Sequence, residues 1–262
     1  MNTKQSLENT GSSRDNTARQ PGNTTPCSGS TARQPGNTTL LPKSILITGS
    51  SGGIGAAVSR HFLALGCEVY GLDLLPQTVT HPLYRHFICD IRDADSLPDI
   101  ENVDVLFNNA GLQNSPDDID NNLRGTVNVT EKYVASPRLR SVLFNASASS
   151  VTGQEYPLYA ASKAGVVGYM KNLAIRLAPR GITVNAVSFG GVITPLNDPV
   201  MNDPASWEKI MAVTPLKKWT TVEEVAQWVE FLTTVNQSMS GQNLLIDNGE
   251  HDLNGTFVWP GA

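Results

Sequence analysis

Apolar residues along this chain alternate between short uninterrupted runs and helical spacings from about residue 40 onward. The short runs predict strands buried on both faces, and they occupy residues 44–48, 68–73, 86–89, 103–107, 141–146, 182–187 and 243–247. Helical spacing predicts helices over residues 54–65, 157–178 and 222–233, the first of them closed by Gly66. Strands that alternate with helices are typical of a parallel sheet, so we expect an open α/β fold with helices on both faces of the sheet.

The first forty residues lack this pattern. They are almost entirely Asn, Thr, Ser, Gly, Gln, Pro and Arg, and the nine residues at 17–25 return unchanged at 31–39. A segment with so little apolar surface cannot offset the entropy lost in ordering it. We therefore expect a disordered low-complexity extension over residues 1–40 and one folded domain over 41–262. A partner-binding or modified tail is the alternative, because each copy of the repeat contains an Asn-Thr-Thr that fits the glycosylation pattern.

Composition narrows the function. The 262 residues are 40% hydrophobic and 16% charged, with a net charge of −5. A mild acidic excess without a clustered basic face argues against a nucleic-acid or anionic-membrane partner. The three cysteines, Cys27, Cys67 and Cys89, fit no metal or redox spacing, so we expect free thiols and no metal site. No apolar run is long enough for a membrane span and the N-terminus lacks a signal-peptide core, so the cytoplasm is the expected compartment.

A glycine-rich turn joins the first predicted strand to the first predicted helix. It reads Gly49-Ser50-Ser51-Gly52-Gly53-Ile54-Gly55. Glycines permit positive φ and a close approach of the backbone, while a helix N-terminus offers free N–H groups and the positive end of its dipole to a phosphate. Strand, turn and helix together predict a Rossmann-type dinucleotide site in a doubly wound, three-layer αβα domain. A generic tight turn is the alternative.

The second predicted strand ends in Asp73, 18 residues after Gly55. At about this separation a carboxylate accepts the ribose 2′-hydroxyl of NAD, and it would repel the 2′-phosphate of NADP. We therefore expect NAD(H) rather than NADP(H) as the cofactor, and a solvated acid at a strand end is the alternative. Two later strands end at Asp90-Ile91 and at Asn108-Asn109-Ala110-Gly111. Strand ends that meet on one side of a parallel sheet form a ligand crevice.

A candidate acid–base pair lies on the helix predicted over 157–178. Tyr159 and Lys163 are four residues apart, so their side chains share one face of the helix. A free phenol has a pKa of about 10, and a fixed cation beside it favours the phenolate. Pro157 suits the first helical turn, which places Tyr159 near the positive end of the helix dipole. Two ordinary surface residues are the alternative for this pair taken alone.

With these motifs in this order, residues 43 to about 250 resemble the short-chain dehydrogenase/reductase family, classical type. The resemblance rests on the glycine turn, the Asn108–Gly111 run, a serine after the fifth strand, Tyr159-x-x-x-Lys163, and the late Gly241-Gln242 with Asp247-Asn248-Gly249. It implies a reversible hydride transfer between a nicotinamide and a carbinol carbon, with Tyr159 as the proton donor or acceptor. Lys163 would bond the nicotinamide ribose and lower the pKa of the phenol.

The resemblance also assigns the remaining site residues. The catalytic set would be Tyr159, Lys163, Ser147 and Asn122, where the serine bonds the substrate oxygen and the asparagine holds a water of the proton relay. An exposed helix asparagine is the alternative for Asn122. The cofactor contacts would come from Gly49, Ser51, Gly53, Ile54, Gly55, Asp73, Asp90, Ile91, Asn109, Ala110, Gly111, Tyr159, Lys163, Val192 and Thr194.

The identity of the serine stays open between three positions. Ser147 lies 12 residues before Tyr159 and directly at the end of a strand, which favours it. Ser149 and Ser150 lie ten and nine residues before Tyr159, and the run Ser150-Val151-Thr152-Gly153 resembles the usual family context of the serine.

The chain departs from the family pattern in two short connections, 90–108 and 111–122, which should leave the substrate mouth more open. Residues 195–219 are expected to form a lid that selects the substrate. We expect an NAD(H)-dependent oxidoreductase for a small secondary alcohol or ketone, and 3-oxoacyl-carrier-protein reduction is one substrate class. A dinucleotide-binding sensor or scaffold without turnover is the alternative. The resemblance implies a homo-oligomer, a dimer or tetramer.

Overall fold

The computed structural model describes residues 41–251 and 253. The extension predicted over 1–40 and Cys27 lie outside the described residues. Within the described part, seven strands form one sheet in the order β3-β2-β1-β4-β5-β6-β7, and each neighbouring pair is parallel. The strands are β1 Ser44–Thr48, β2 Glu68–Asp73, β3 Tyr84–Ile88, β4 Val105–Asn108, β5 Ser141–Asn145, β6 Thr183–Phe189 and β7 Asn243–Ile246. The predicted doubly wound α/β fold is confirmed.

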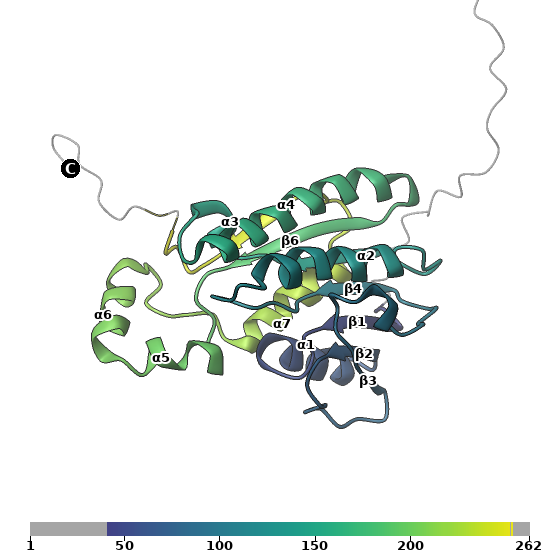
Figure 1. Cartoon of the computed structure of the whole chain (residues 1–262), viewed down its shortest axis with the longest axis horizontal. Coiled ribbons are helices and arrows are strands. Elements are labelled where there is room, and N and C mark those ends of the chain that lie inside the picture. Colours follow the sequence, from purple (N-terminus) through teal and green to yellow (C-terminus); the bar gives the residue numbers. More distant parts are fainter. Residues whose placement is uncertain (1–40, 252, 254–262) are drawn as a thin grey trace, which may run out of the picture. The chain divides into compact units, whose positions relative to one another are not determined.

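Helices cover both faces of this sheet (Figure 1). The α-helices are α1 Gly53–Ala64, α2 Thr126–Tyr133, α3 Ser149–Thr152, α4 Pro157–Leu177, α5 Asp198–Met201, α6 Pro204–Val213 and α7 Val222–Glu230. Shorter 3-10 turns are η1 Ala94–Ser96, η3 Ala178–Arg180 and η4 Pro195–Asn197, and π-helical turns are η2 Ile119–Gly125 and η5 Phe231–Val235. The buried side chains of α2 and α4 pack on one face, and those of α1 and α7 pack on the other.

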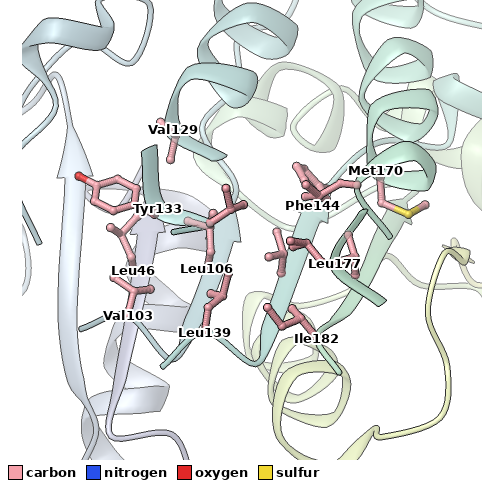
Figure 2. Close-up of a cluster of buried hydrophobic side chains, with 14 of the residues drawn as sticks. Leu46, Val103, Leu106, Val129, Tyr133, Leu139, Phe144, Met170, Leu177 and Ile182 are labelled. Atoms are coloured by element: carbon pink, nitrogen blue, oxygen red, sulfur yellow. The ribbon is translucent and has the colours of Figure 1, made fainter. Parts of the chain in front are cut away.

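Alternation along the central strands divides the core in two. In β1, Leu46 points to the α2 and α4 side, whereas Ile45 and Ile47 point to the α1 and α7 side. Figure 2 shows the first of these clusters, in which Phe144 of β5 and Met170 of α4 are fully buried. Truncation of a buried Phe to Ala costs about 3–5 kcal/mol. The two clusters therefore fix the position of the sheet between its helices.

Several predicted boundaries are wrong by one to three residues. The fourth strand begins at Val105 and not at residue 103, because the N–H of Val103 is taken by Ser136 Oγ at 3.1 Å. The sixth strand extends to Phe189, whose ladder partner is Ile246 of β7. The third strand spans Tyr84–Ile88 instead of 86–89.

The last predicted helix, 222–233, ends as an α-helix at Glu230. The chain then widens into the π-helical turn η5. The hydroxyls of Thr233 and Thr234 donate to the carbonyls of Val229 and Glu230, both at 2.7 Å. Such back-bonding competes with the regular helical ladder.

The two connections expected to be short are short. Between β3 and β4 the chain forms only the 3-10 turn η1, and after Gly111 no helix begins before Ile119. Figure 1 shows α5 and α6 set to one side of the sheet, where the chain leaves β6. These helices belong to the segment predicted as a lid.

Candidate cofactor and active site

The chain reverses its direction of winding between β1 and β4. These strands are neighbours, but β2 and β3 follow on one side of β1 and β5 to β7 on the other side of β4. In open α/β sheets, ligands bind outside the carboxyl ends of strands at such a switch point. The glycine turn follows β1 and the Asn109–Gly111 run follows β4, so both lie at this edge.

The glycine turn has the backbone that only glycine adopts readily. Gly49 has φ +67° and Gly53 has φ +43°. A Cβ added to Gly55 would lie 2.0 Å from the carbonyl oxygen of Gly49, so the turn is closed on itself. The helix α1 that follows has no side-chain N-cap and no acidic residue in its first turn, which holds Ile54. Its first amides and the positive end of its dipole are therefore suited to a phosphate.

Asp73 lies at the end of β2 beside the glycine turn. Its Oδ2 accepts the N–H of Ser51 at 2.9 Å, and its Oδ1 accepts the N–H of Leu75 at 2.9 Å. Each carboxylate oxygen has a second lone pair, so the group can still receive a ribose hydroxyl. The hydroxyl of Ser51 donates to the Leu75 carbonyl at 3.1 Å, which ties the turn to the segment after β2.

The segment after β4 is fixed to the end of β1. The N–H groups of Asn109 and Ala110 both donate to Thr48 Oγ1 at 2.9 Å. The amide nitrogen of Asn109 donates to the Thr48 carbonyl at 3.0 Å, and its oxygen accepts Asn145 Nδ2 at 3.0 Å. A Cβ added to Gly111 would lie 3.2 Å from Lys163 Nζ. This run therefore connects the glycine turn with the candidate catalytic lysine.

Asp90 and Ile91 follow the carboxyl end of β3. The Arg92 guanidinium donates to both oxygens of Asp90, from Nε at 3.0 Å and from Nη2 at 2.7 Å. These bonds lower the pKa of the Asp90 carboxyl. Ile91 is buried, and a Cβ added to Gly125 would lie 2.7 Å from its Cγ1.

Val192 and Thr194 come from the loop after β6. Val192 is buried, and its carbonyl accepts Asn197 Nδ2 at 2.7 Å. A Cβ added to Gly53 would lie 3.5 Å from Thr194 Cγ2, so this threonine lies opposite the glycine turn. These cofactor residues expected from the sequence lie at or after the carboxyl ends of β1, β2, β3, β4 and β6. That they bind a dinucleotide stays a prediction.

Tyr159 and Lys163 lie in the first two turns of α4, which begins at Pro157. Lys163 Nζ lies 5.7 Å from the centre of the Tyr159 ring and donates to the Asn145 carbonyl at 2.8 Å. Burial lowers the pKa of Lys163 to about 8, and the carboxylates of Asp118 and Glu155 oppose this shift.

The Tyr159 phenol is the second half of this pair. Burial raises its pKa to about 12, the Ser147 hydroxyl acts in the lowering direction, and the charges of Glu155 and Asp118 raise it further. The chain's own groups thus leave the pKa of the phenol above its ordinary value. The lowering expected from Lys163 stays a prediction for the protein with cofactor bound.

The three candidate serines have different partners. Ser147 is 4% exposed, and its hydroxyl acts to lower the pKa of the Tyr159 phenol. The hydroxyl of Ser149 lies 3.1 Å from that of Ser147. The hydroxyl of Ser150 pairs with Ser188 at 3.1 Å and points elsewhere. The geometry favours Ser147 as the serine of the site.

Asn122 is 1% exposed, which excludes the exposed helix asparagine. Its Oδ1 accepts the N–H of Leu112 at 2.7 Å, and its Nδ2 donates to the Leu112 carbonyl at 2.9 Å and to Ser162 Oγ at 3.0 Å. A Cβ added to Gly111 would lie 3.5 Å from its Oδ1 and 3.2 Å from Lys163 Nζ, so asparagine and lysine border the same small space.

The sequence did not single out some groups that shape the site. The main-chain oxygen of Asn145 accepts a hydrogen bond from Lys163 Nζ, and Gln113 Nε2 donates to Glu155 Oε2 at 2.9 Å. A main-chain acceptor and a pair of residues distant in sequence produce no recognisable motif in the amino-acid sequence. Asp118 does carry a signal, since it is an acid one turn before Asn122.

Metal-binding clusters and membrane-spanning helices are absent from the part of the chain that the structure describes. It contains no group of three or more His, Cys, Asp or Glu side chains placed to hold a metal ion. Among its helices, none combines the length and apolar character that a bilayer crossing needs. Cys67 and Cys89 are free and buried.

Comparison with known proteins gives the same fold and similar sequences. A family model described as enoyl-(acyl carrier protein) reductase matches residues 49–251. The 3-oxoacyl-[acyl-carrier-protein] reductase of Thermotoga maritima is 30% identical over 240 residues, covering 79% of this chain and 97% of that protein.

Two solved structures are also similar. A putative 2-deoxy-d-gluconate 3-dehydrogenase from Agrobacterium tumefaciens, with bound NADP, has a TM-score of 0.75 at 27% identity, covering 82% of this chain and 99% of that one. A short chain dehydrogenase from Leptospira borgpetersenii, with bound NAD+, has a TM-score of 0.72 at 26% identity, covering 80% of this chain and 92% of that one.

Proposed function

The chain belongs to the short-chain dehydrogenase/reductase family, and from this premise we propose that it interconverts a secondary alcohol and a ketone with NAD(H), using Tyr159 as the acid–base group. Membership makes it an oxidoreductase that acts on CH–OH and keto groups of small molecules, and not a sensor without turnover. The two similar structures from Agrobacterium tumefaciens and Leptospira borgpetersenii contain NADP and NAD+, respectively. The residue roles, the choice of NAD(H) and the substrate class are our proposals.

The observation that carries the proposal is the convergence of Ser147, Tyr159 and Lys163. The serine hydroxyl acts on the phenol in the direction that lowers its pKa, and the ammonium lies 5.7 Å from the centre of the same ring. When bound, the nicotinamide supplies the hydride in reduction and accepts it in oxidation. In reduction, Tyr159 gives its proton to the carbonyl oxygen while that oxygen gains charge. In oxidation, the phenolate removes the hydroxyl proton.

Ser147 and Lys163 support this proton transfer. Ser147 donates a hydrogen bond to the substrate oxygen and so stabilises the charge that develops there. Lys163, held by the Asn145 carbonyl at 2.8 Å, presents its charge to the phenolate. Asn122 fixes the neighbouring backbone at Leu112 and offers a place for a relay water beside Lys163. The proton can then leave the phenol toward solvent.

NAD(H) is favoured by the acid at the end of β2. Among the described residues, Asp73 accepts its two hydrogen bonds from main-chain N–H groups and none from a cationic side chain. A 2′-phosphate placed there would meet an uncompensated negative charge. A ribose 2′-hydroxyl would instead donate to the carboxylate.

The substrate class remains broad. The relative from Thermotoga maritima is named a 3-oxoacyl-[acyl-carrier-protein] reductase, so 3-oxoacyl thioesters are one candidate. The short connection after Gly111 leaves an exposed rim at Leu112, consistent with a substrate that enters from that side. A homo-oligomer is proposed from family membership alone.

A substrate and cofactor panel tests this function. Oxidation of NADH and of NADPH is followed at 340 nm with simple ketones, cyclic ketones, keto sugars and 3-oxoacyl thioesters. We expect turnover with at least one class and a higher kcat/KM with NADH. Tight NADH binding without turnover across the panel would contradict the catalytic proposal, and faster turnover with NADPH would contradict the role of Asp73.

A further inference from the structure

Asp118 is a buried carboxylate to which the mechanism above gives no role. It is 1% exposed and lies at the N-terminus of η2. Its Oδ2 accepts the N–H of Ser115 at 3.2 Å, and its own N–H donates to the Ser115 carbonyl at 3.2 Å. Its Oδ1 is buried without a hydrogen-bond partner among the described residues. A buried charge of this kind requires a compensating donor or cation nearby.

Contacts between η2 and α4 indicate where that cation lies. Asn122 of η2 donates to Ser162 Oγ at 3.0 Å, and a Cβ added to Gly165 would lie 2.7 Å from Leu123 Cδ2. From the first pair to the second, the residue number increases on both helices, so η2 and α4 run in the same direction. Asp118 precedes Asn122 by four residues, so it lies beside the turn of α4 that precedes Ser162.

That turn of α4 carries Tyr159, and Lys163 follows on the same face. Burial lowers the pKa of Lys163 to about 8, and of the two charges that oppose this, Asp118 has the larger effect and Glu155 the smaller. Glu155 lies on the exposed segment before α4, where water and salt screen it. Asp118 is buried, where screening is weak.

We propose that Asp118 is a positioning residue that faces Lys163 across the contact of η2 with α4 and holds the lysine in its charged form. A neutral amine could not stabilise the Tyr159 phenolate, so the carboxylate acts on the reaction through the lysine. The unpartnered Oδ1 is the atom that would face the ammonium, directly or through a water. The proposal rests on the roles assigned above to Tyr159 and Lys163.

The direct test is the titration of Lys163 in the chain without cofactor. The chemical shift of its Cε carbon is followed by NMR between pH 6 and 11 in the wild type, in Asp118→Asn and in Asp120→Asn. The Asp118→Asn side chain can still accept the Ser115 N–H but carries no charge. We expect the pKa of Lys163 to fall by about one unit in this variant.

Asp120→Asn is the matched control, because Asp120 is an exposed acid on the same helix that pairs with Arg124. It should leave the titration of Lys163 unchanged. An unchanged pKa of Lys163 in a folded Asp118→Asn protein would overturn the proposal. If that variant melts below the titration temperature, Asp118→Ser provides the same removal of charge in a smaller side chain.

The salt dependence of the pKa of Lys163 distinguishes the effect of a buried charge from that of an exposed one. The effect of Glu155→Gln on the pKa of Lys163 should diminish between 0.05 and 1 M KCl, roughly as the Debye length shortens from above 10 Å to about 3 Å. The effect of Asp118→Asn should persist over the same range, and its disappearance at high salt would contradict a buried contact. Because no substrate is present, these results remain informative even if the proposed turnover is not found.

Discussion

Lys163 Nζ lies 5.7 Å from the centre of the Tyr159 ring and is anchored 2.8 Å from the main-chain oxygen of Asn145. The ring contact follows from the four-residue spacing on α4, whereas the anchor comes from the end of β5. Because Asn145 also bonds Asn109, which bonds Thr48 and Gly49, the lysine is connected to the glycine turn. This arrangement gives the site its geometry before any substrate binds.

The buried lysine should make stability depend on pH. Its pKa is lowered to about 8 in the folded chain, against about 10.4 for an unfolded lysine. The unfolded chain therefore binds more protons between these values, and the stability of the wild type should rise with pH in this window. Lys163→Met removes the effect, so its free energy of unfolding relative to the wild type should fall by up to roughly 1.4 kcal/mol per pH unit from pH 8 to 10.

Urea unfolding at several pH values measures this difference. Lys171→Met, which changes an exposed lysine on the same helix, is the control and should show no such trend. If the difference in free energy of unfolding between Lys163→Met and the wild type does not vary with pH, the lowered pKa of Lys163 is contradicted.

The glycine turn predicts a contrast between two alanine variants. A Cβ at position 55 would lie 2.0 Å from the Gly49 oxygen, whereas one at position 52 meets nothing within 4 Å, and Gly52 has an ordinary extended φ of −149°. Gly55→Ala should cost about 1–3 kcal/mol of stability, because the turn must open. The free energy of unfolding of Gly52→Ala should lie within about 0.5 kcal/mol of the wild-type value. Equal stabilities in urea would show that the turn is not closed as described.

Asp73 should determine the preference between the two nicotinamide cofactors. Asp73→Ala removes a charged acceptor, so NADH binding should weaken about tenfold or more while NADPH binding weakens less or improves. Titration of cofactor fluorescence in the variant, the wild type and Asp99→Ala gives the ratio of the two dissociation constants. Asp99 has a side chain 97% exposed and serves as the control. A ratio unchanged in Asp73→Ala would contradict the assignment.

Much of this arrangement is readable in the sequence because it is local. The spacing of apolar residues predicts the strands and helices, and the positions of the glycines predict the turn. The start of β4 could not be predicted, because it depends on Ser136, which takes the N–H of Val103 from 33 residues away. The π-helical turn η5 depends on hydroxyls that also suit a regular helix.

The sequence predicts the residues of the candidate site, but it does not predict their contacts. Spacing places Tyr159 and Lys163 on one face of α4, but it leaves three serines open, and the effect of Ser147 on the pKa of the phenol favours that serine. Burial of Asp118 was not predictable, since an acid in a polar segment ordinarily faces water.

The serine assignment predicts unequal losses of activity. Ser147→Ala should lower kcat about 10²-fold, because it removes a donor to the charge that develops on the substrate oxygen. Ser150→Ala should remain near wild type, since that hydroxyl pairs with Ser188. Steady-state kinetics with the best ketone of the panel compares the two variants. A larger loss in Ser150→Ala would transfer the role to that serine.

The central claim is that Tyr159 donates and accepts the proton, and Tyr159→Phe tests it most directly because only the hydroxyl is lost. NADH oxidation with the best ketone is measured in the variant and the wild type, together with NADH affinity by fluorescence. The account predicts a fall in kcat of about 10²–10⁴-fold with NADH affinity within a few-fold of wild type. Near wild-type kcat in Tyr159→Phe would contradict it.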